Sequence, residues 1–93
     1  MSNATTGDFD PTAPWQLNPQ VSLRDEAFGA LAYHHGNRRL VFLKSTTLVA
    51  LVRALSQHAS ARAAVDALVP APQRDRYEKA LASLVESEVL CEC

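Results

Sequence analysis

The fold is decided by residues 36–47, which have the sequence Gly36-Asn37-Arg38-Arg39-Leu40-Val41-Phe42-Leu43-Lys44-Ser45-Thr46-Thr47. Gly and Asn tolerate positive φ angles, so the first two residues predict a hairpin turn. The apolar run 40–43 is too short for periodicity to distinguish a strand from a buried helix. The turn before it and the helix-capping hydroxyl groups of residues 45–47 after it favour a strand. We therefore expect a strand at 40–43 that leads directly into a helix.

Two further strands are expected before this turn. Residues 20–24 alternate polar and apolar side chains, which is the pattern of a half-buried strand. Asp25 and Glu26 have low strand propensity and predict a bend. Residues 28–35 contain Phe28, Leu31 and Tyr33 with small residues between them, and they form a second candidate strand. The turn at Gly36-Asn37 would pair this strand with the one at 40–43.

Three helices are expected after the strands. Each has apolar residues at helical spacing, and these are Leu48, Leu51, Val52 and Leu55, then Ala61, Ala64, Val65 and Leu68, then Tyr77, Leu81, Leu84 and Val85. Ser60 can cap the second helix, Pro70 ends it, and Pro72 suits the first turn of the third. Strands followed by helices predict an α+β domain, with a three-stranded antiparallel sheet followed by three helices.

Length and charge set the broad class. The chain has 93 residues, enough for one domain, which we expect at residues 15–90 between a flexible N-terminal tail (1–14) and a C-terminal tail (91–93). Nine basic and ten acidic residues give a net charge of −1, which weakens a nucleic-acid function. No apolar run approaches the ~20 residues that span a bilayer, and no secretory signal is present, so we expect no membrane partner and a cytoplasmic location.

The residues that could carry chemistry do not form a site in the sequence. His34 and His35 are adjacent, so on a strand they point to opposite faces and cannot hold one metal ion together. Cys91 and Cys93 lack the second pair of ligands that a zinc site requires, and three glycines form no phosphate-binding loop. The sequence therefore predicts no catalytic residues, no metal site and no cofactor, and a chain that is not an enzyme.

The strand at 40–43 is the feature with the clearest binding potential. It is the last of three strands, so it can lie at a sheet edge, where unpaired N–H and C=O groups accept another chain. It can equally be a central or purely structural strand. An apolar edge could also pair with its own copy in a homodimer, which would occlude the edge.

Several stretches resemble the mycofactocin biosynthesis chaperones, a group within the PqqD-like RiPP recognition element family. The resemblance covers roughly residues 15–90, and residues 15–44 make it specific. It rests on the segments Trp15-Gln16-Leu17-Asn18-Pro19-Gln20-Val21-Ser22-Leu23-Arg24, Phe28-Gly29-Ala30-Leu31-Ala32-Tyr33-His34, Gly36, Arg38-Arg39-Leu40 and Phe42-Leu43-Lys44. It implies a winged-helix-like fold, in agreement with the strands and helices expected above.

The resemblance also implies a function. Family members bind the leader of a ribosomal precursor peptide and deliver it to a radical S-adenosylmethionine maturase. This chain has no Cys-x₃-Cys-x₂-Cys motif, so the radical chemistry would belong to the partner. Carried over by position, the leader would add as a strand along Leu40, Val41, Phe42, Leu43 and Lys44. Its apolar side chains would enter a groove between this strand and the third helix, against Tyr77, Leu81 and Leu84. Arg39 and Lys44 would lie at the two ends of this groove and contact acidic leader residues.

Two other functions stay open at the level of sequence. One is a small winged-helix DNA-binding regulator, although the second helix offers only Arg62 to a phosphate and also carries Asp66. The other is a structural subunit of a multienzyme complex that binds no peptide.

Overall fold

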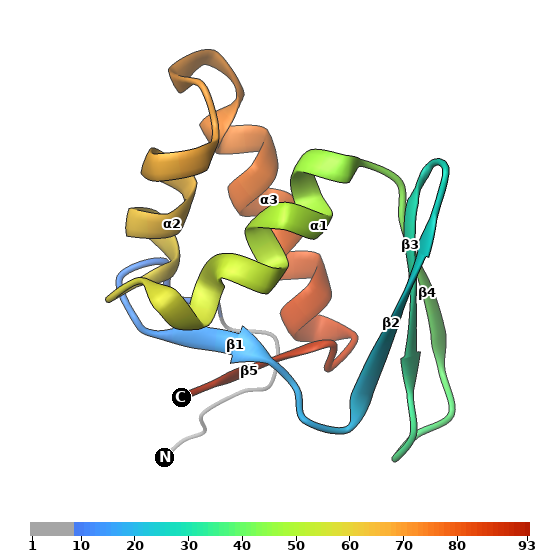
Figure 1. The fold of residues 1–93 in the computed structure, drawn as a ribbon. Helices are drawn as coiled ribbons and strands as arrows, with labels where there is room; N and C mark the ends of the chain where they lie inside the picture. The colour runs from blue at the N-terminus through green and yellow to red at the C-terminus, as the bar shows by residue number, and fades with distance from the viewer. Residues whose placement is uncertain (1–8) are drawn as a thin grey trace.

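The computed structural model describes residues 9–93, which form a mixed α+β domain (Figure 1). The strands are β1 (Trp15–Leu17), β2 (Val21–Glu26), β3 (Gly29–His34), β4 (Leu40–Leu43) and β5 (Leu90–Glu92). The helices are α1 (Thr46–Ala54), α2 (Ala61–Leu68) and α3 (Arg74–Glu86), with short 3₁₀ turns at Leu55–Gln57 and Ala71–Gln73. A three-stranded antiparallel sheet followed by three helices confirms the predicted fold class.

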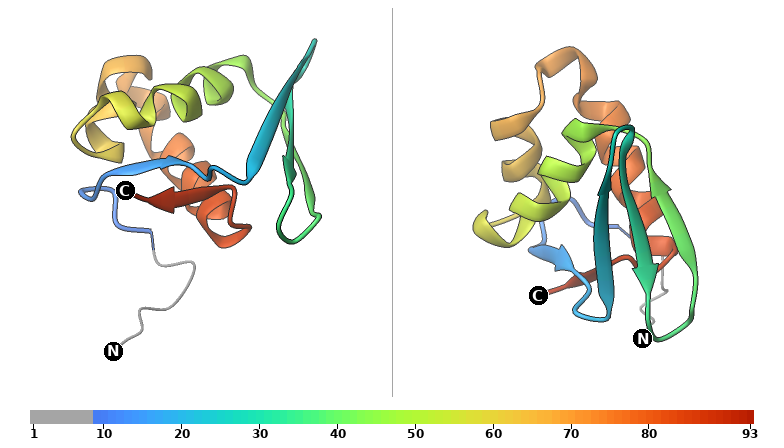
Figure 2. Two further views of the ribbon diagram at one scale, coloured as in Figure 1. Left: turned by 60° about the horizontal axis from the view of Figure 1, so that its bottom comes forward. Right: turned by 45° about the vertical axis from the view of Figure 1, so that its right-hand side comes forward.

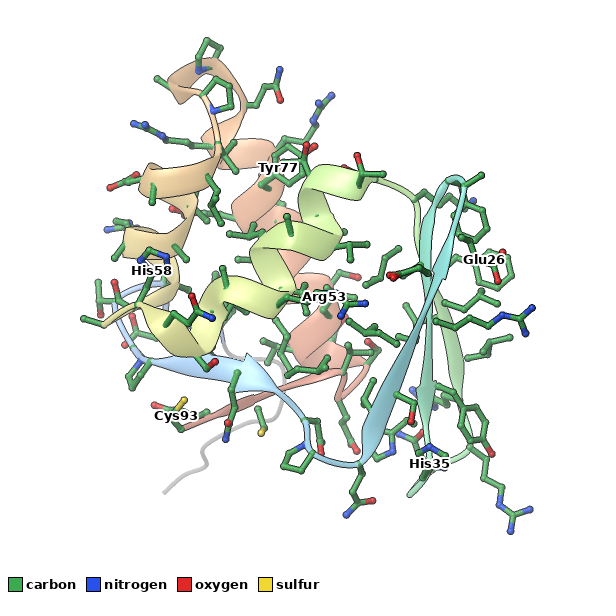
Figure 3. The ribbon with its side chains drawn as sticks, viewed as in Figure 1. Glu26, His35, Arg53, His58, Tyr77 and Cys93 are labelled. Carbon is green, nitrogen blue, oxygen red and sulfur yellow. The ribbon has the colours of Figure 1, made fainter. Side chains whose placement is uncertain are left out.

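The three-stranded sheet has the order β2-β3-β4, and the helices lie on one side of it (Figure 2). The expectation of a bend at Asp25 and Glu26 was wrong, because both residues belong to β2 and pair with Ala30 and Gly29. The turn is confined to residues 27 and 28, so the ladder continues to the end of the hairpin. Arg53 of α1, labelled in Figure 3, lies 2.8 Å from the Asp25 carboxylate, so an ion pair joins this end of the sheet to the helix.

The β3–β4 hairpin turns at residues 35–39, where His34 organises the backbone. The His34 ring is buried, and its Nδ1 accepts hydrogen bonds from the backbone N–H groups of Gly36 and Asn37 at 3.0 and 3.1 Å. His35 points the other way and lies exposed, with its Nε2 2.8 Å from the Ser22 hydroxyl. The positive φ angle falls on Arg38, at 64°, rather than on Gly36 or Asn37. The two histidines therefore have separate structural partners.

A second, two-stranded sheet joins the two ends of the domain. Strand β1 pairs antiparallel with β5, so the C-terminal residues expected as a tail lie within this strand or directly after it. The Trp15 ring is buried, and its Nε1 donates to the backbone oxygen of Asp10 at 2.8 Å. The backbone oxygens of Pro11 and Ala13 accept from the first N–H groups of α2, so residues 10–14 also contact the helices. Residues 1–8 of the expected tail lie outside the described part.

The core lies between the sheet and the helices, and α1 and α3 both contribute to it. Its largest fully buried side chains are Leu43, Leu51, Leu55, Leu81, Val52, Val65 and Val89. Of the three hydroxyl residues expected as caps of the first helix, Ser45 is the cap, and its Oγ accepts from Leu48 N at 3.1 Å. The expected cap of the second helix is confirmed, since Ser60 Oγ accepts from Ala63 N at 3.1 Å. Within residues 9–93, the structure has no helix long and apolar enough to cross a membrane.

Candidate peptide-binding site

Strand β4 is an edge strand of the three-stranded sheet, because its one neighbour in the sheet is β3. The sequence left open whether this strand is central or peripheral, and the sheet order answers that question. Within residues 9–93, no backbone hydrogen bond joins Leu40 or Phe42 to a segment beyond the hairpin. The outer side of β4 therefore presents an unpaired backbone.

The register shows which backbone groups point outward. His34 N donates to Arg39 O at 2.9 Å, which marks residues 34 and 39 as a hydrogen-bonded pair. In an antiparallel ladder such pairs alternate with non-hydrogen-bonded pairs. Val41 and Leu43 therefore bond to β3, where they lie opposite Ala32 and Ala30. The N–H and C=O groups of Leu40 and Phe42 consequently face the open edge.

The side chains of β4 divide between two faces of the sheet. Leu43 is buried in the core and Val41 is half-buried on the same side. Leu40 and Phe42 point to the outer face and are 55% and 54% exposed. The open edge thus lies between a helix-covered face and an uncovered apolar face.

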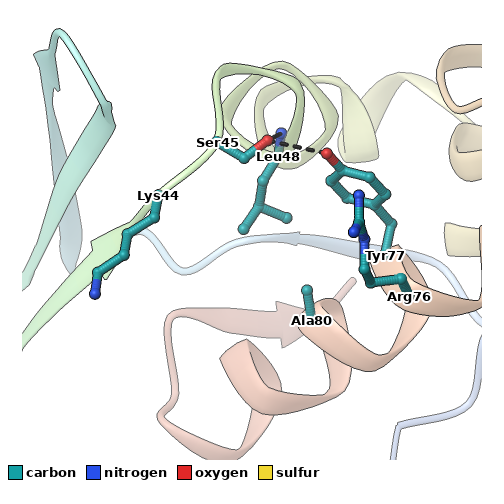
Figure 4. A pocket seen from close by; sticks show the side chains of 6 residues that line it. All are labelled: Lys44, Ser45, Leu48, Arg76, Tyr77 and Ala80. Atoms are coloured by element: carbon teal, nitrogen blue, oxygen red, sulfur yellow. Dashed lines mark hydrogen bonds between the residues drawn. The ribbon is translucent and has the colours of Figure 1, made fainter. Parts of the chain in front are cut away.

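A groove opens where β4 ends and α1 begins, next to α3 (Figure 4). Its volume is about 360 Å³, and it is lined by Lys44, Ser45, Leu48, Arg76, Tyr77 and Ala80. Ser45 contacts both helices that border the groove, since its hydroxyl caps α1 and also lies 3.0 Å from the Tyr77 hydroxyl of α3. The hydrogen bond with Ser45 lowers the pKa of the Tyr77 phenol below its ordinary value. This bond joins the start of α1 to the first turn of α3.

The groove combines an apolar floor with a cationic rim. Leu48, Ala80 and the Tyr77 ring supply apolar surface, and Arg76 lies 5.7 Å from the centre of that ring. Within residues 9–93, Lys44 and Arg76 form no ion pair with a carboxylate. The rim can therefore receive an acidic side chain without first breaking an internal salt bridge among these residues.

The structure brings together some of the residues expected in the site and separates others. Lys44 and Tyr77 line the groove, and residues 40–43 form the edge beside it. Leu81 and Leu84 are 0% and 4% exposed, so they lie in the core and present no surface to a peptide. Arg39 precedes β4 and lies at its opposite end from Lys44.

Sequence reasoning missed four groove residues: Ser45, Leu48, Arg76 and Ala80. Ser45 was assigned only a capping role and Leu48 only a core role. Ala80 lies four positions after Arg76 and three after Tyr77, so it is a neighbour of each on the helix surface. That spacing of a cation and a small residue was the available signal, but it does not show which way the face points.

DNA binding and metal binding can both be compared with the same geometry. On α2, the Arg62 guanidinium lies 3.4 Å from Glu78, and Asp66 lies 3.6 Å from Arg74. This pairing leaves α2 without a free basic surface to meet phosphates. Within the described residues, no three His, Cys, Asp or Glu side chains gather as a metal site would require.

Comparisons with known proteins agree on one family. The sequence model of the peptide chaperone MftB family matches residues 14–91. Three curated proteins named peptide chaperone MftB are similar to this chain: that of Mycolicibacterium smegmatis is 47% identical, that of Mycobacterium ulcerans 44%, and that of Mycobacterium tuberculosis 43%. The alignments cover 88%, 94% and 94% of this chain and 81% of each relative. No solved structure matches the chain.

Proposed function

Since this chain belongs to the peptide chaperone MftB family, we propose that it holds the leader of a ribosomal precursor peptide as an added strand on β4. It then presents the precursor to a radical S-adenosylmethionine maturase in mycofactocin biosynthesis. A peptide chaperone is not an enzyme, which agrees with the sequence-based expectation of a non-catalytic chain.

The single observation that carries this proposal is the open edge of β4 beside a groove with an apolar floor. A leader strand would bond to the outward N–H and C=O groups of Leu40 and Phe42. Backbone ladder bonds give affinity with little sequence preference, and the adjoining pocket selects particular side chains. An edge and a pocket together are therefore what leader recognition requires.

The alternation of a strand determines where the leader side chains go. Successive residues point to opposite faces, so every second leader side chain would project toward the helices. One apolar side chain of that set would fill the groove against Leu48, Tyr77 and Ala80. These contacts replace the expected ones with Leu81 and Leu84, because both of those side chains are buried in the core.

Charge would set the register of the leader in the groove. Lys44 and Arg76 lie at the rim, so an acidic leader residue two positions from the apolar anchor, on the same face of the added strand, would meet both. Arg39 would meet an acidic residue farther along the leader, at the other end of β4.

The free thiols of Cys91 and Cys93 suit the reducing conditions of the cytoplasm, where precursor peptides are made.

The experiment that tests the proposal is calorimetric titration of the full precursor peptide into the chain, with a precursor that lacks the leader as control. We expect saturable one-site binding of the full peptide and no heat from the truncated one. A leader that must order on binding should show unfavourable entropy and a negative heat-capacity change. Equal binding of the two peptides would contradict leader recognition. No binding of either would favour a structural subunit that carries no peptide.

Charge reversal at Lys44 tests the electrostatic part of the proposal. Lys44→Glu should weaken leader binding about fivefold to tenfold at low salt, because it places a carboxylate against the acidic leader residue. The difference from the wild-type chain should shrink as salt is raised. Lys79→Glu is a matched control, since Lys79 is 79% exposed on α3, pairs with Asp75 and does not line the groove. Equal affinity of both variants and the wild type would contradict a role for charge.

A further inference from the structure

The outer face of the three-stranded sheet is apolar and uncovered. Leu40 and Phe42 of β4 lie directly opposite Tyr33 and Leu31 of β3, so these four side chains share one face. Phe28, in the β2–β3 turn, is 43% exposed and its ring lies 5.9 Å from that of Phe42. An exposed sheet face normally carries polar residues, so an apolar cluster of this kind marks a binding surface.

This face is separate from the groove. The helices cover the opposite side of the sheet, and the right-hand view of Figure 2 shows the three strands with no helix in front of them. The groove residues Ser45, Tyr77 and Ala80 belong to the helical side. A protein that covers the outer face would therefore leave the groove free to hold a peptide.

Basic residues adjoin the apolar cluster. Arg24 lies opposite Leu31 and is 80% exposed, and Arg38 is exposed in the turn that precedes β4. Glu26 is the one acidic residue on this face of β2, and it is paired with Arg24 at 2.9 Å. Two copies of such a face would bring like charges together, so the charge pattern opposes self-pairing and fits a partner with an acidic rim.

We propose that the outer face of the β2-β3-β4 sheet, with Phe28, Leu31 and Phe42 at its centre, binds the radical S-adenosylmethionine maturase. The maturase would contribute an apolar patch that is bordered by carboxylates. This inference rests on the proposed function for the identity of the partner. A leader strand added to β4 would extend this same face by one strand, and every second leader side chain would lie on it. An enzyme docked there contacts carrier and cargo together.

The test measures binding of the purified radical S-adenosylmethionine maturase to the chain by biolayer interferometry. The variant Phe28→Ser/Leu31→Thr alters the outer face and replaces no residue of the edge strand or of the groove. It should weaken enzyme binding at least about tenfold, while leader affinity by calorimetry stays within about twofold. Leu68→Gln is the matched control, because Leu68 is 41% exposed on α2 and should leave enzyme binding unchanged. Unchanged enzyme affinity of the double variant would overturn the proposal.

A second variant keeps the test decisive if the first fails to fold. Arg24→Glu/Arg38→Glu changes two exposed side chains and should weaken enzyme binding at least about tenfold at low salt. Sedimentation of the wild-type chain without enzyme should show a monomer. A dimer that the Phe28→Ser/Leu31→Thr variant dissociates would overturn the proposal, since the face would then serve self-association.

The separate measurements of enzyme binding and leader binding distinguish a failure of this inference from a failure of the proposed function. Leader binding without any enzyme binding would overturn the docking surface and leave leader recognition intact. Enzyme binding that the outer-face variants weaken, in a chain that binds no leader, would support the docking surface and contradict the proposed function.

Discussion

Phe42→Pro should weaken leader binding by about tenfold to a hundredfold and leave the domain folded. The Phe42 N–H faces the open edge, so proline removes one donor from the leader without removing a bond between β3 and β4. A lost ladder bond with an unsatisfied partner costs about 1–3 kcal/mol, and a tenfold to hundredfold loss of affinity corresponds to about 1.4–2.8 kcal/mol, within that range. Calorimetry with the leader peptide measures the change, and circular dichroism confirms the fold.

Two neighbouring substitutions separate the backbone from the side chain. Phe42→Ala removes the same ring but keeps the N–H, so it should bind the leader at least about fivefold more tightly than Phe42→Pro. Val41→Pro removes an N–H that bonds to β3, so its main effect should be a loss of stability. Equal affinities of Phe42→Pro and Phe42→Ala would show that the leader does not bond to this edge.

Gly29→Ala should destabilise the domain by about 3 kcal/mol, which lowers Tm by roughly 15 °C in a domain of this size. Gly29 has φ of 151°, a conformation that residues with side chains rarely adopt. A Cβ at this position would overlap the backbone oxygen of Leu43 and lie 2.9 Å from Ser45 N. Both of these atoms are backbone, so neither can rotate away as a side chain would.

The same substitution should also weaken leader binding, because Ser45 caps α1 and contacts Tyr77 in the groove. Thermal unfolding measures the stability change. Ala27→Gly is the control, since Ala27 is exposed in the same turn and loses only a methyl group there. A Gly29→Ala chain as stable as the Ala27→Gly chain would contradict the close approach of Gly29 to the end of β4.

The sequence predicts the parts of this fold that depend on local patterns. The two serine caps, the three apolar helix stripes and the β3–β4 hairpin all follow from residues close together in the chain. The β1–β5 sheet was not predicted, because each of its strands has three residues and their partners are more than 70 positions apart, as with Trp15 and Glu92. Short strands with distant partners carry no periodicity of their own.

The candidate site was predicted in part for a related reason. Residues 40–44 are contiguous, so naming the edge strand required only its place as the last strand. On α3, an apolar stripe identifies one face, but the rotation of the helix against the core determines which residues lie at its border. Tyr77 lies at that border with Arg76 and Ala80, whereas Leu81 and Leu84 lie inside it. Spacing alone does not contain that rotation.

The most direct measurement of leader binding on β4 is amide hydrogen exchange by NMR, with and without saturating leader peptide. In the free chain the amides of Leu40 and Phe42 should exchange fast, and those of Val41 and Leu43 slowly, because only the latter bond to β3. The leader should slow exchange at Leu40 and Phe42 at least about tenfold and change Val41 and Leu43 little. Leader-dependent protection that leaves Leu40 and Phe42 unchanged would contradict strand addition at this edge.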